Sequence, residues 1–399
     1  MHMLQIEEKT SPQSPLFQLG FRPFFMAAMG FASLAIMLWG YLYFSHASLA
    51  NPRYIPSFWH AHEMIFGYGL AVAAGFILTA AKNWTGVQTI NGKPLAGLFL
   101  LWLFARIFPF VLGESSMIIL AVVDVLFGLI LTITTAHPII KTKQWHQSAF
   151  PGKMLLMLIS NIIFYLGLLN IWPAGLHYGL YAGFYVLLAL IFTMGRRVIP
   201  FFIEKGVGVP FQPKNWRWLD LSSLGIFLAF AIADTLQANS LISIGLAAIL
   251  FVLHSIRLIG WYHPNIWKKS LLWSLYIGYI WIVLGFLLKT FSMIFPISPF
   301  LSLHSFSVGG IGLITMGMMA RVSLGHTGRN VFDPPNILKP IFFLLITAAI
   351  VRVLLPIFFS DFYALWIGLS QALWATSFGM IFIMYLPMFL KPRVDGRAG

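Results

Sequence analysis

The stretch SMIILAVVDVLFGLILTITTA at residues 116–136 contains a single charged side chain, Asp124. An α-helix rises 1.5 Å per residue, so this stretch can cross roughly 30 Å of hydrocarbon as one helix. Eleven other apolar runs have a comparable length. They lie at 23–45, 60–81, 95–112, 154–172, 176–195, 219–236, 239–260, 271–290, 298–320, 340–356 and 363–390. The sequence therefore predicts an all-α, polytopic transmembrane helix bundle of about 12 spans.

The composition excludes a water-soluble surface. Hydrophobic residues make up 59% of the 399 residues and charged residues only 9%, where a soluble domain carries about 25% charged residues. The formal net charge of +14 comes from Lys and Arg spread through short loops, which indicates membrane topology and no nucleic-acid partner. The chain has no Cys, so disulfides, cysteine-ligated clusters and covalently attached c-type haem are excluded.

Positive charge is confined to alternate connections between the predicted spans. One set of connections holds Lys82, Lys93, Lys141, Lys143, Lys153, residues 196–217, Lys268, Lys269, Arg329, Lys339 and residues 391–397. The other set holds little beyond Arg53, Lys289 and Arg352. By the positive-inside rule the first set is cytoplasmic, which predicts that both termini are cytoplasmic. We expect one transmembrane domain over 1–399, which the loop at 196–218 could divide into six-helix halves, 1–205 and 206–399.

Ionisable residues inside the spans are the best indicators of function, because each is costly to insert into hydrocarbon. Arg106 in the third span and Asp124 in the fourth belong to one helical hairpin and lie at similar depth. We predict that they pair, either as a structural ion pair or as part of a proton relay.

The segment WHAHEM at 59–64 opens the second span at the predicted external side. On an α-helix His60 and His62 project about 200° apart, so they must serve different partners. His60 and Glu63 share a face, where the carboxylate could orient the imidazole or act as a second metal ligand. Small residues from Gly67 to Gly75 follow, and they allow close approach of either a neighbouring helix or a flat macrocycle.

His304 enters the tenth span from the same predicted side. Histidines from two helices at one level suit axial ligation of a b-type haem or a copper site, because neutral imidazole is a usual ligand for both. The alternative is a hydrogen-bonded core histidine.

Basic residues at the predicted cytoplasmic side form a second group of candidates. His254 lies about four turns into its span, one turn before Arg257, and needs a buried partner. Arg321, His326, Thr327 and Arg329 could hold an anion such as a haem propionate, or could anchor the helix at lipid phosphates. Arg196 and Arg197, just before Pro200, present the same choice.

Five motifs resemble the NnrS family in their expected order. They are GFRPFF at 20–25, WHAHEMIFGYG at 59–69, GFILTAAKNWTG at 75–86, GRRVIPFF at 195–202 and MMARVSLGHTGR at 318–329. The resemblance implies a bacterial inner-membrane protein that contains haem and copper and is linked to nitric oxide and nitrosative stress. The positions that it implies are Arg22, His60, His62, Glu63, Asn83, Arg197, His304, Arg321, His326, Thr327 and Arg329.

Three functions are open at the level of sequence. The leading hypothesis is a haem protein in which His60 or His62 pairs with His304, with nitric oxide as the small ligand and arginines at the other side available for propionates. A membrane oxidoreductase would take electrons from quinol or a partner protein. The alternatives are a transporter with a polar pathway of Arg106, Asp124, His254 and Arg257, or a factor that delivers haem or metal.

Overall fold

The computed structural model describes residues 14–51, 54–113, 116–237, 240–295 and 297–397. Over these ranges the regular structure is helical, and 12 helices are long and apolar enough to cross a membrane. Nine of them are named by one α-helix: α1 (Phe21–Ser45), α4 (Gly92–Val111), α5 (Met117–Lys141), α6 (Ala149–Leu168), α7 (Gly175–Gly206), α8 (Arg217–Leu236), α9 (Leu241–Trp261), α10 (Ser270–Phe291) and α15 (Tyr363–Leu390). The predicted transmembrane bundle is confirmed. Arg53 lies outside the described residues.

The three remaining spans are interrupted by π-helical segments. The second consists of α2 (Pro56–His62), η2 (Glu63–Gly69) and α3 (Leu70–Thr85). The tenth consists of α11 (Pro299–His304), η6 (Ser305–Ile311) and α12 (Gly312–His326), and the eleventh of α13 (Leu338–Ala349), η7 (Ile350–Leu354) and α14 (Leu355–Phe358). A π-helical turn widens the helix and is frequent at functional sites. The hydropathy pattern gave no sign of these segments.

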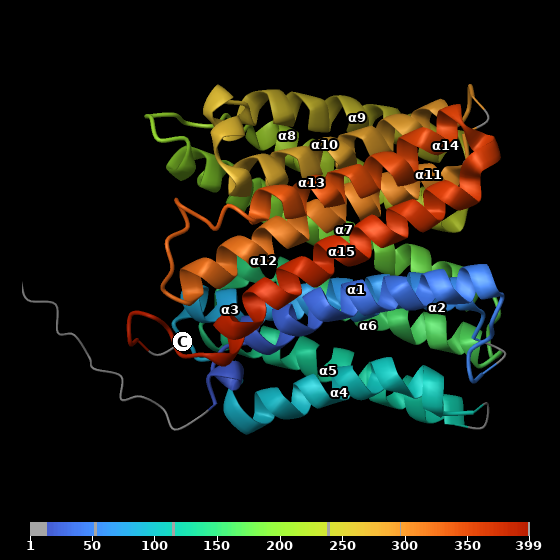
Figure 1. Cartoon of the computed structure of the whole chain (residues 1–399), viewed down its shortest axis with the longest axis horizontal. Helices are drawn as coiled ribbons and strands as arrows, with labels where there is room; N and C mark the ends of the chain where they lie inside the picture. The colour runs from blue at the N-terminus through green and yellow to red at the C-terminus, as the bar shows by residue number, and fades with distance from the viewer. Residues whose placement is uncertain (1–13, 52–53, 114–115, 238–239, 296, 398–399) are drawn as a thin grey trace, which may run out of the picture.

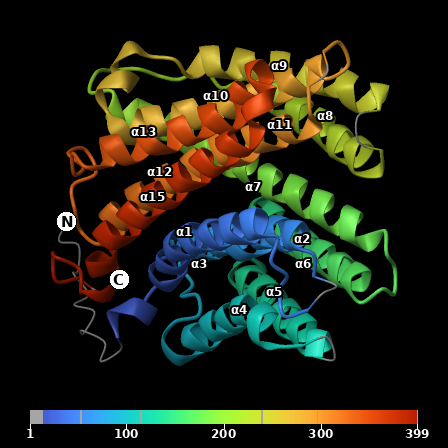
Figure 2. The ribbon, with the colours of Figure 1, turned by 45° about the vertical axis from the view of Figure 1, so that its right-hand side comes forward.

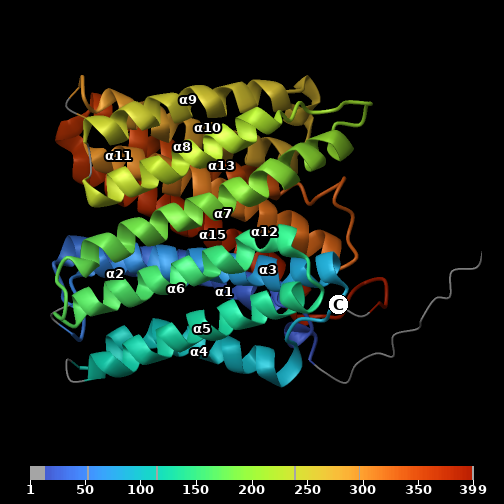
Figure 3. The same cartoon turned by 180° about the vertical axis from the view of Figure 1, so that it is seen from behind.

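The helices lie side by side along the long axis of the molecule, with α4 and α5 at one edge and α8 and α9 at the other (Figure 1). The first and last spans, α1 and α15, pack together, and α6 packs along α7 (Figures 1 and 3). In Figure 2, α4 and α5 lie on one side of α1 and α3, and α9 and α10 lie beyond α7. The second, ninth and tenth spans are the most buried, at 78%, 78% and 83% of their apolar windows.

Two helices continue past the ends of their apolar runs. α7 runs to Gly206 although it contains Pro200, and α12 runs to His326. Hydropathy marks where hydrocarbon ends, but it does not mark where the helix ends, and charged side chains such as Arg196 do not break a helix. The predicted loop at 196–218 is consequently shortened to residues 207–216.

The ends of the bundle differ in charge. The short helix η1 (Pro15–Phe17) and residues 391–397 lie at one end, which we call the terminal end (Figure 1). Because spans alternate in direction, the Lys-rich and Arg-rich connections lie at this end too. Arg352, in contrast, lies toward the other end, which we call the opposite end. The cytoplasmic orientation of the terminal end stays a prediction.

Candidate functional site

A buried polar network joins η2, α4 and α5 near the opposite end. Arg106 Nη1 donates to Glu63 Oε2 at 2.7 Å, and Arg106 Nη2 donates to Asp124 Oδ1. The three side chains are only 1–2% exposed. The predicted pairing of Arg106 with Asp124 is confirmed, and Glu63 makes it a triad in which one guanidinium serves two carboxylates.

Residues of α6 extend this network to His62. Asp124 Oδ2 accepts hydrogen bonds from Asn161 Nδ2 and Tyr165 Oη, both at 3.0 Å. A carboxylate only accepts, so the Asn161 amide presents its carbonyl oxygen to His62. His62 Nε2 therefore donates to Asn161 Oδ1 at 2.9 Å, while His62 Nδ1 faces Glu63 Oε1 at 3.1 Å. Both ring nitrogens of His62 are engaged within the protein.

His60 lies on the other face of the same helix. Its ring stacks on Trp39 of α1, with 4.8 Å between centroids and 5° between planes. The prediction that His60 and His62 serve different partners is confirmed. Glu63 orients His62, not His60 as its spacing had suggested. His60 Nδ1 is buried without a hydrogen-bond partner in the described part of the chain.

His304 and Arg352 complete a group around His60. His304 Nδ1 lies 2.6 Å from the Phe300 carbonyl oxygen. Because a carbonyl only accepts, the proton is on Nδ1 and the Nε2 lone pair is left open, as in a metal-ligating histidine. His304 interacts electrostatically with His60, and Arg352 interacts with both. The helices α2 and α11 that carry the imidazoles both lie at the end away from the C-terminus in Figure 1.

These residues do not form a four-ligand metal centre. In the ranges that the structure describes, no three His, Asp or Glu side chains are grouped as metal ligands. Arg106 and Asn161 engage Glu63 and His62, and which of His60, His62, Glu63 and His304 binds a metal stays a prediction.

His254 has the buried partner that its position requires. Its Nδ1 lies 2.6 Å from the Tyr279 hydroxyl, and its ring is stacked on Phe192 and Phe286. Counting helical rise, His254 is about 20 Å into α9 from the opposite end, whereas His304 is about 8 Å into its span. His254 therefore cannot share one metal with His304. Its buried Nε2 has no hydrogen-bond partner within the described chain.

Arginines at the terminal end have separate structural contacts. Arg22 donates to the carbonyl oxygens of Met388, Phe389 and Lys391, which closes the C-terminus of α15. The Arg321 guanidinium lies 3.8 Å from the Phe202 ring centroid, a cation–π contact toward α7.

The predicted patch of Arg321, His326, Thr327 and Arg329 is therefore divided. The His326 ring packs on Phe21 instead, and the Thr327 hydroxyl donates back to Ser323. Arg329 interacts electrostatically with Arg22. Arg321 is 17 residues from His304 along the chain, about 25 Å of helix, so a haem on His304 could not reach it. Of the other implied positions, Asn83 is exposed and Arg197 donates to Gln147 Oε1 at 2.8 Å.

A family model described as NnrS protein matches residues 15–393. The chain belongs to the NnrS family. No curated protein gives a significant match. Membership and the multi-pass helix bundle together fit a membrane protein of the nitric oxide response.

Several residues of this NnrS-family site were not predicted. Asn161 is a polar side chain within an apolar span and could have been found by the reasoning that identified Arg106. Trp39 looks like any membrane aromatic, and its contact with His60 depends on how α1 packs against α2. Arg352 stood out only as an unpaired charge in the more neutral set of connections.

Proposed function

We propose that this NnrS-family protein binds b-type haem through His60 and His304 and thereby protects a bacterial inner membrane against nitric oxide. The observation that carries the proposal is a pair of imidazoles from two different spans, close enough to interact, each with an uncommitted ring nitrogen. The family's association with haem supports the same assignment.

The surroundings of the pair favour haem over a bare metal ion. Arg352 interacts electrostatically with both imidazoles, and its positive charge opposes a free cation but suits the propionates of a haem. Bound haem would supply an iron that takes up nitric oxide. The chain's own contribution is to hold the ligands, with Trp39 fixing the plane of His60 and the Phe300 carbonyl fixing the tautomer of His304.

The network behind His60 acts as a rigid support. Arg106, Glu63 and His62 connect the second span to α4 and α6, so α2 is held from the face opposite to His60. Copper receives no assigned site, because the described residues provide no group of three ligands. Any turnover would draw electrons from quinol or a partner protein.

The test is the reduced-minus-oxidised absorption spectrum of protein purified in a mild detergent, with pyridine haemochrome and copper quantification. We expect stoichiometric b-type haem whose spectrum shifts on addition of nitric oxide. Protein that remains colourless after haem supplementation would overturn the proposal.

The transporter alternative is less well supported. Its polar pathway needs Arg106 and Asp124 to meet His254 and Arg257, but the first pair lies in α4 and α5 and the second in α9, at opposite edges of the bundle (Figure 1). Arg257 is bonded to Asp220 and Ser223 of α8 instead.

A further inference from the structure

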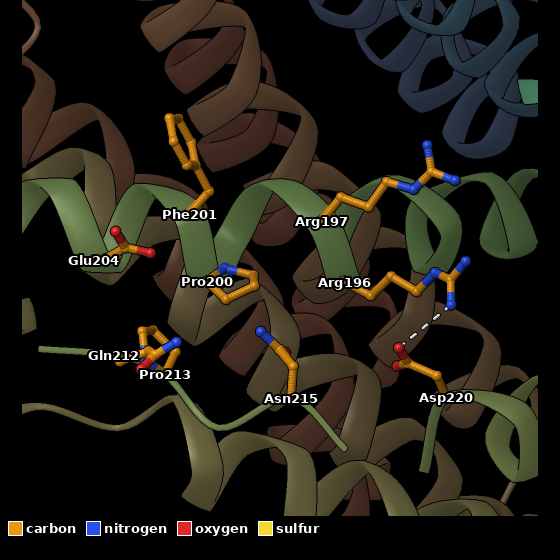
Figure 4. A pocket seen from close by; sticks show the side chains of 9 residues that line it. All are labelled: Arg196, Arg197, Pro200, Phe201, Glu204, Gln212, Pro213, Asn215 and Asp220. Carbon is orange, nitrogen blue, oxygen red and sulfur yellow. Dashed lines mark ion pairs between the residues drawn. The ribbon is translucent and has the colours of Figure 1, made fainter. Parts of the chain in front are cut away.

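A polar pocket of about 330 Å³ opens at the terminal end, between the last turns of α7 and the segment leading into α8 (Figure 4). Its volume is at the lower end of the range of small-molecule sites. The lining residues are Arg196, Arg197, Pro200, Phe201, Glu204, Gln212, Pro213, Asn215 and Asp220. The pocket is independent of His60 and His304, which lie near the other end of the bundle.

Acidic groups around the pocket do not balance its basic groups. Asp220 serves two guanidiniums, since its Oδ1 accepts from Arg257 at 2.6 Å and its Oδ2 lies 3.3 Å from Arg196. The other lining carboxylate, Glu204, pairs with Lys205 at 2.7 Å. Arg197 has no carboxylate partner among the residues that the structure describes, and its hydrogen bond goes to the neutral amide of Gln147.

Lys153, which does not line the pocket, adds a positive charge near its arginines. It lies close enough to interact electrostatically with both Arg196 and Arg197. Like charges held together destabilise the folded state unless an anion neutralises them. The arrangement therefore favours an anionic ligand at the arginine side of the pocket.

Asn215 contributes an oriented donor. Its Oδ1 accepts a hydrogen bond from the Trp261 indole at 3.0 Å, which fixes the amide and leaves its NH₂ group to point elsewhere. In Figure 4 this nitrogen is directed toward α7, across the pocket from Pro200. Arg196, Arg197 and Asn215 all line the pocket, and guanidinium groups and an amide donor suit the oxygens of a phosphate group.

The location adds a constraint on the ligand. The pocket is at the ends of membrane spans, the depth of lipid headgroups. Phe201 lines it with 51% of its surface exposed, and Trp218 nearby is 54% exposed. These aromatic side chains can contact the glycerol or acyl part of a lipid whose phosphate is in the pocket.

We propose that this pocket binds the phosphate group of an anionic ligand, carried by a phospholipid headgroup or by a soluble phosphate ester, with Arg197 and Asn215 as donors. The experiment measures thermal unfolding of the full chain in a maltoside detergent. The probes are short-chain phosphatidylglycerol, glycerol 3-phosphate and, as the charge control, glycerol. Stabilisation by the lipid alone identifies a lipid site, and stabilisation by both phosphates identifies a site for the phosphate group itself.

Variants decide whether the pocket is responsible. R197Q should weaken the apparent affinity roughly tenfold, the loss expected for one charge-assisted hydrogen bond. E204Q removes a negative charge from the lining and should strengthen the affinity, a change of opposite sign that unfolding cannot mimic. K268Q alters an exposed lysine at the same end that does not line the pocket, and it should leave the affinity unchanged. Absence of stabilisation by either phosphate, or equal binding by R197Q and the wild type, would overturn the proposal.

Discussion

His60 and His62 are separated by one residue, yet His60 stacks on Trp39 of α1 while His62 donates to Asn161 of α6. His60 Nδ1 has no hydrogen-bond partner in the described part of the chain, whereas both ring nitrogens of His62 contact a buried polar network. We therefore expect different results from the two alanine variants. H60A should fold normally and lose the haem signal, whereas H62A should lower the midpoint of thermal unfolding.

These outcomes are measured by pyridine haemochrome and by thermal unfolding of the same preparations. H304A should match H60A in haem content. His46, exposed at the opposite end with a left-handed backbone (φ 54°) that Asn tolerates, provides the control H46N, which should keep both properties. Unchanged haem content in both H60A and H304A would remove the axial-ligand assignment.

Arg106 is the cation on which the buried network depends. R106M would leave Glu63 and Asp124 as buried carboxylates without their guanidinium. Removing one partner from a buried ion pair typically costs about 3–5 kcal/mol, so we expect a lower yield and a clearly lower unfolding midpoint. R217M, at an exposed arginine, is the matched control. A normal unfolding midpoint for R106M, together with altered function, would support a proton relay instead.

We expect the positive charge of Arg352 to raise the midpoint potential of a haem bound by His60 and His304. A nearby positive charge favours the reduced form of the iron, because reduction lowers the local positive charge. R352Q should therefore lower the midpoint potential by an amount on the order of tens of millivolts. A spectroelectrochemical titration measures this, with K268Q as a charge-matched variant at the distant end. An unchanged or raised potential would show that Arg352 does not act on the iron.

The general architecture was predictable because hydrocarbon imposes one rule on every span. The twelve apolar runs predicted the twelve spans that the described residues form. The free-energy cost of burying an unpaired charge predicted that Arg106 pairs with Asp124, as it does. The rotation of about 100° per residue in an α-helix also predicted correctly that His60 and His62 lie on different faces and contact different partners.

The remaining parts of the site depend on packing between spans distant in sequence. The Trp39 contact needs the relative position of α1 and α2, and the π-helical turn at Glu63 changes the register on which its predicted pairing with His60 rested. Packing between distant spans also divides the predicted patch at Arg321. Arg321 contacts Phe202 of α7, whereas His326 at the end of the same helix contacts Phe21 of α1.

Gly179 tests how closely α6 and α7 pack. A Cβ at this position would lie 2.5 Å from the backbone nitrogen of Phe164, which cannot move without displacing α6. G179A should therefore destabilise the protein by about 1–3 kcal/mol, the usual cost of overpacking. At Gly97 of α4 a Cβ would meet nothing within 4 Å, so G97A should be neutral or slightly stabilising. Equal unfolding midpoints for the two variants would contradict this account of the helix contact.

Asp395 and Arg393 fix the last turn that the structure describes. Arg393 donates to both carboxylate oxygens of Asp395, at 2.9 and 2.6 Å, and to the His326 carbonyl oxygen at 3.0 Å. The hydrogen bonds from Arg393 hold the pKa of Asp395 well below its usual range. A lowered pKa means that the contact is fully formed above the unfolded value of about 3.9, and that it is lost only as the pH falls through the lower pKa of the folded protein.

The absence of cysteine makes this contact measurable by site-directed spin labelling. Val394 is 62% exposed, so V394C can carry a nitroxide between the two paired residues. We expect its mobility to stay constant from about pH 8 to about pH 4 and to rise only at pH values well below the ordinary carboxyl pKa of about 3.9. With D395N in the same background the label should be mobile throughout, because the amide cannot retain Arg393 as an ion pair. A label that gains mobility near neutral pH would assign the contact to another titrating group, of which His326 is the nearest.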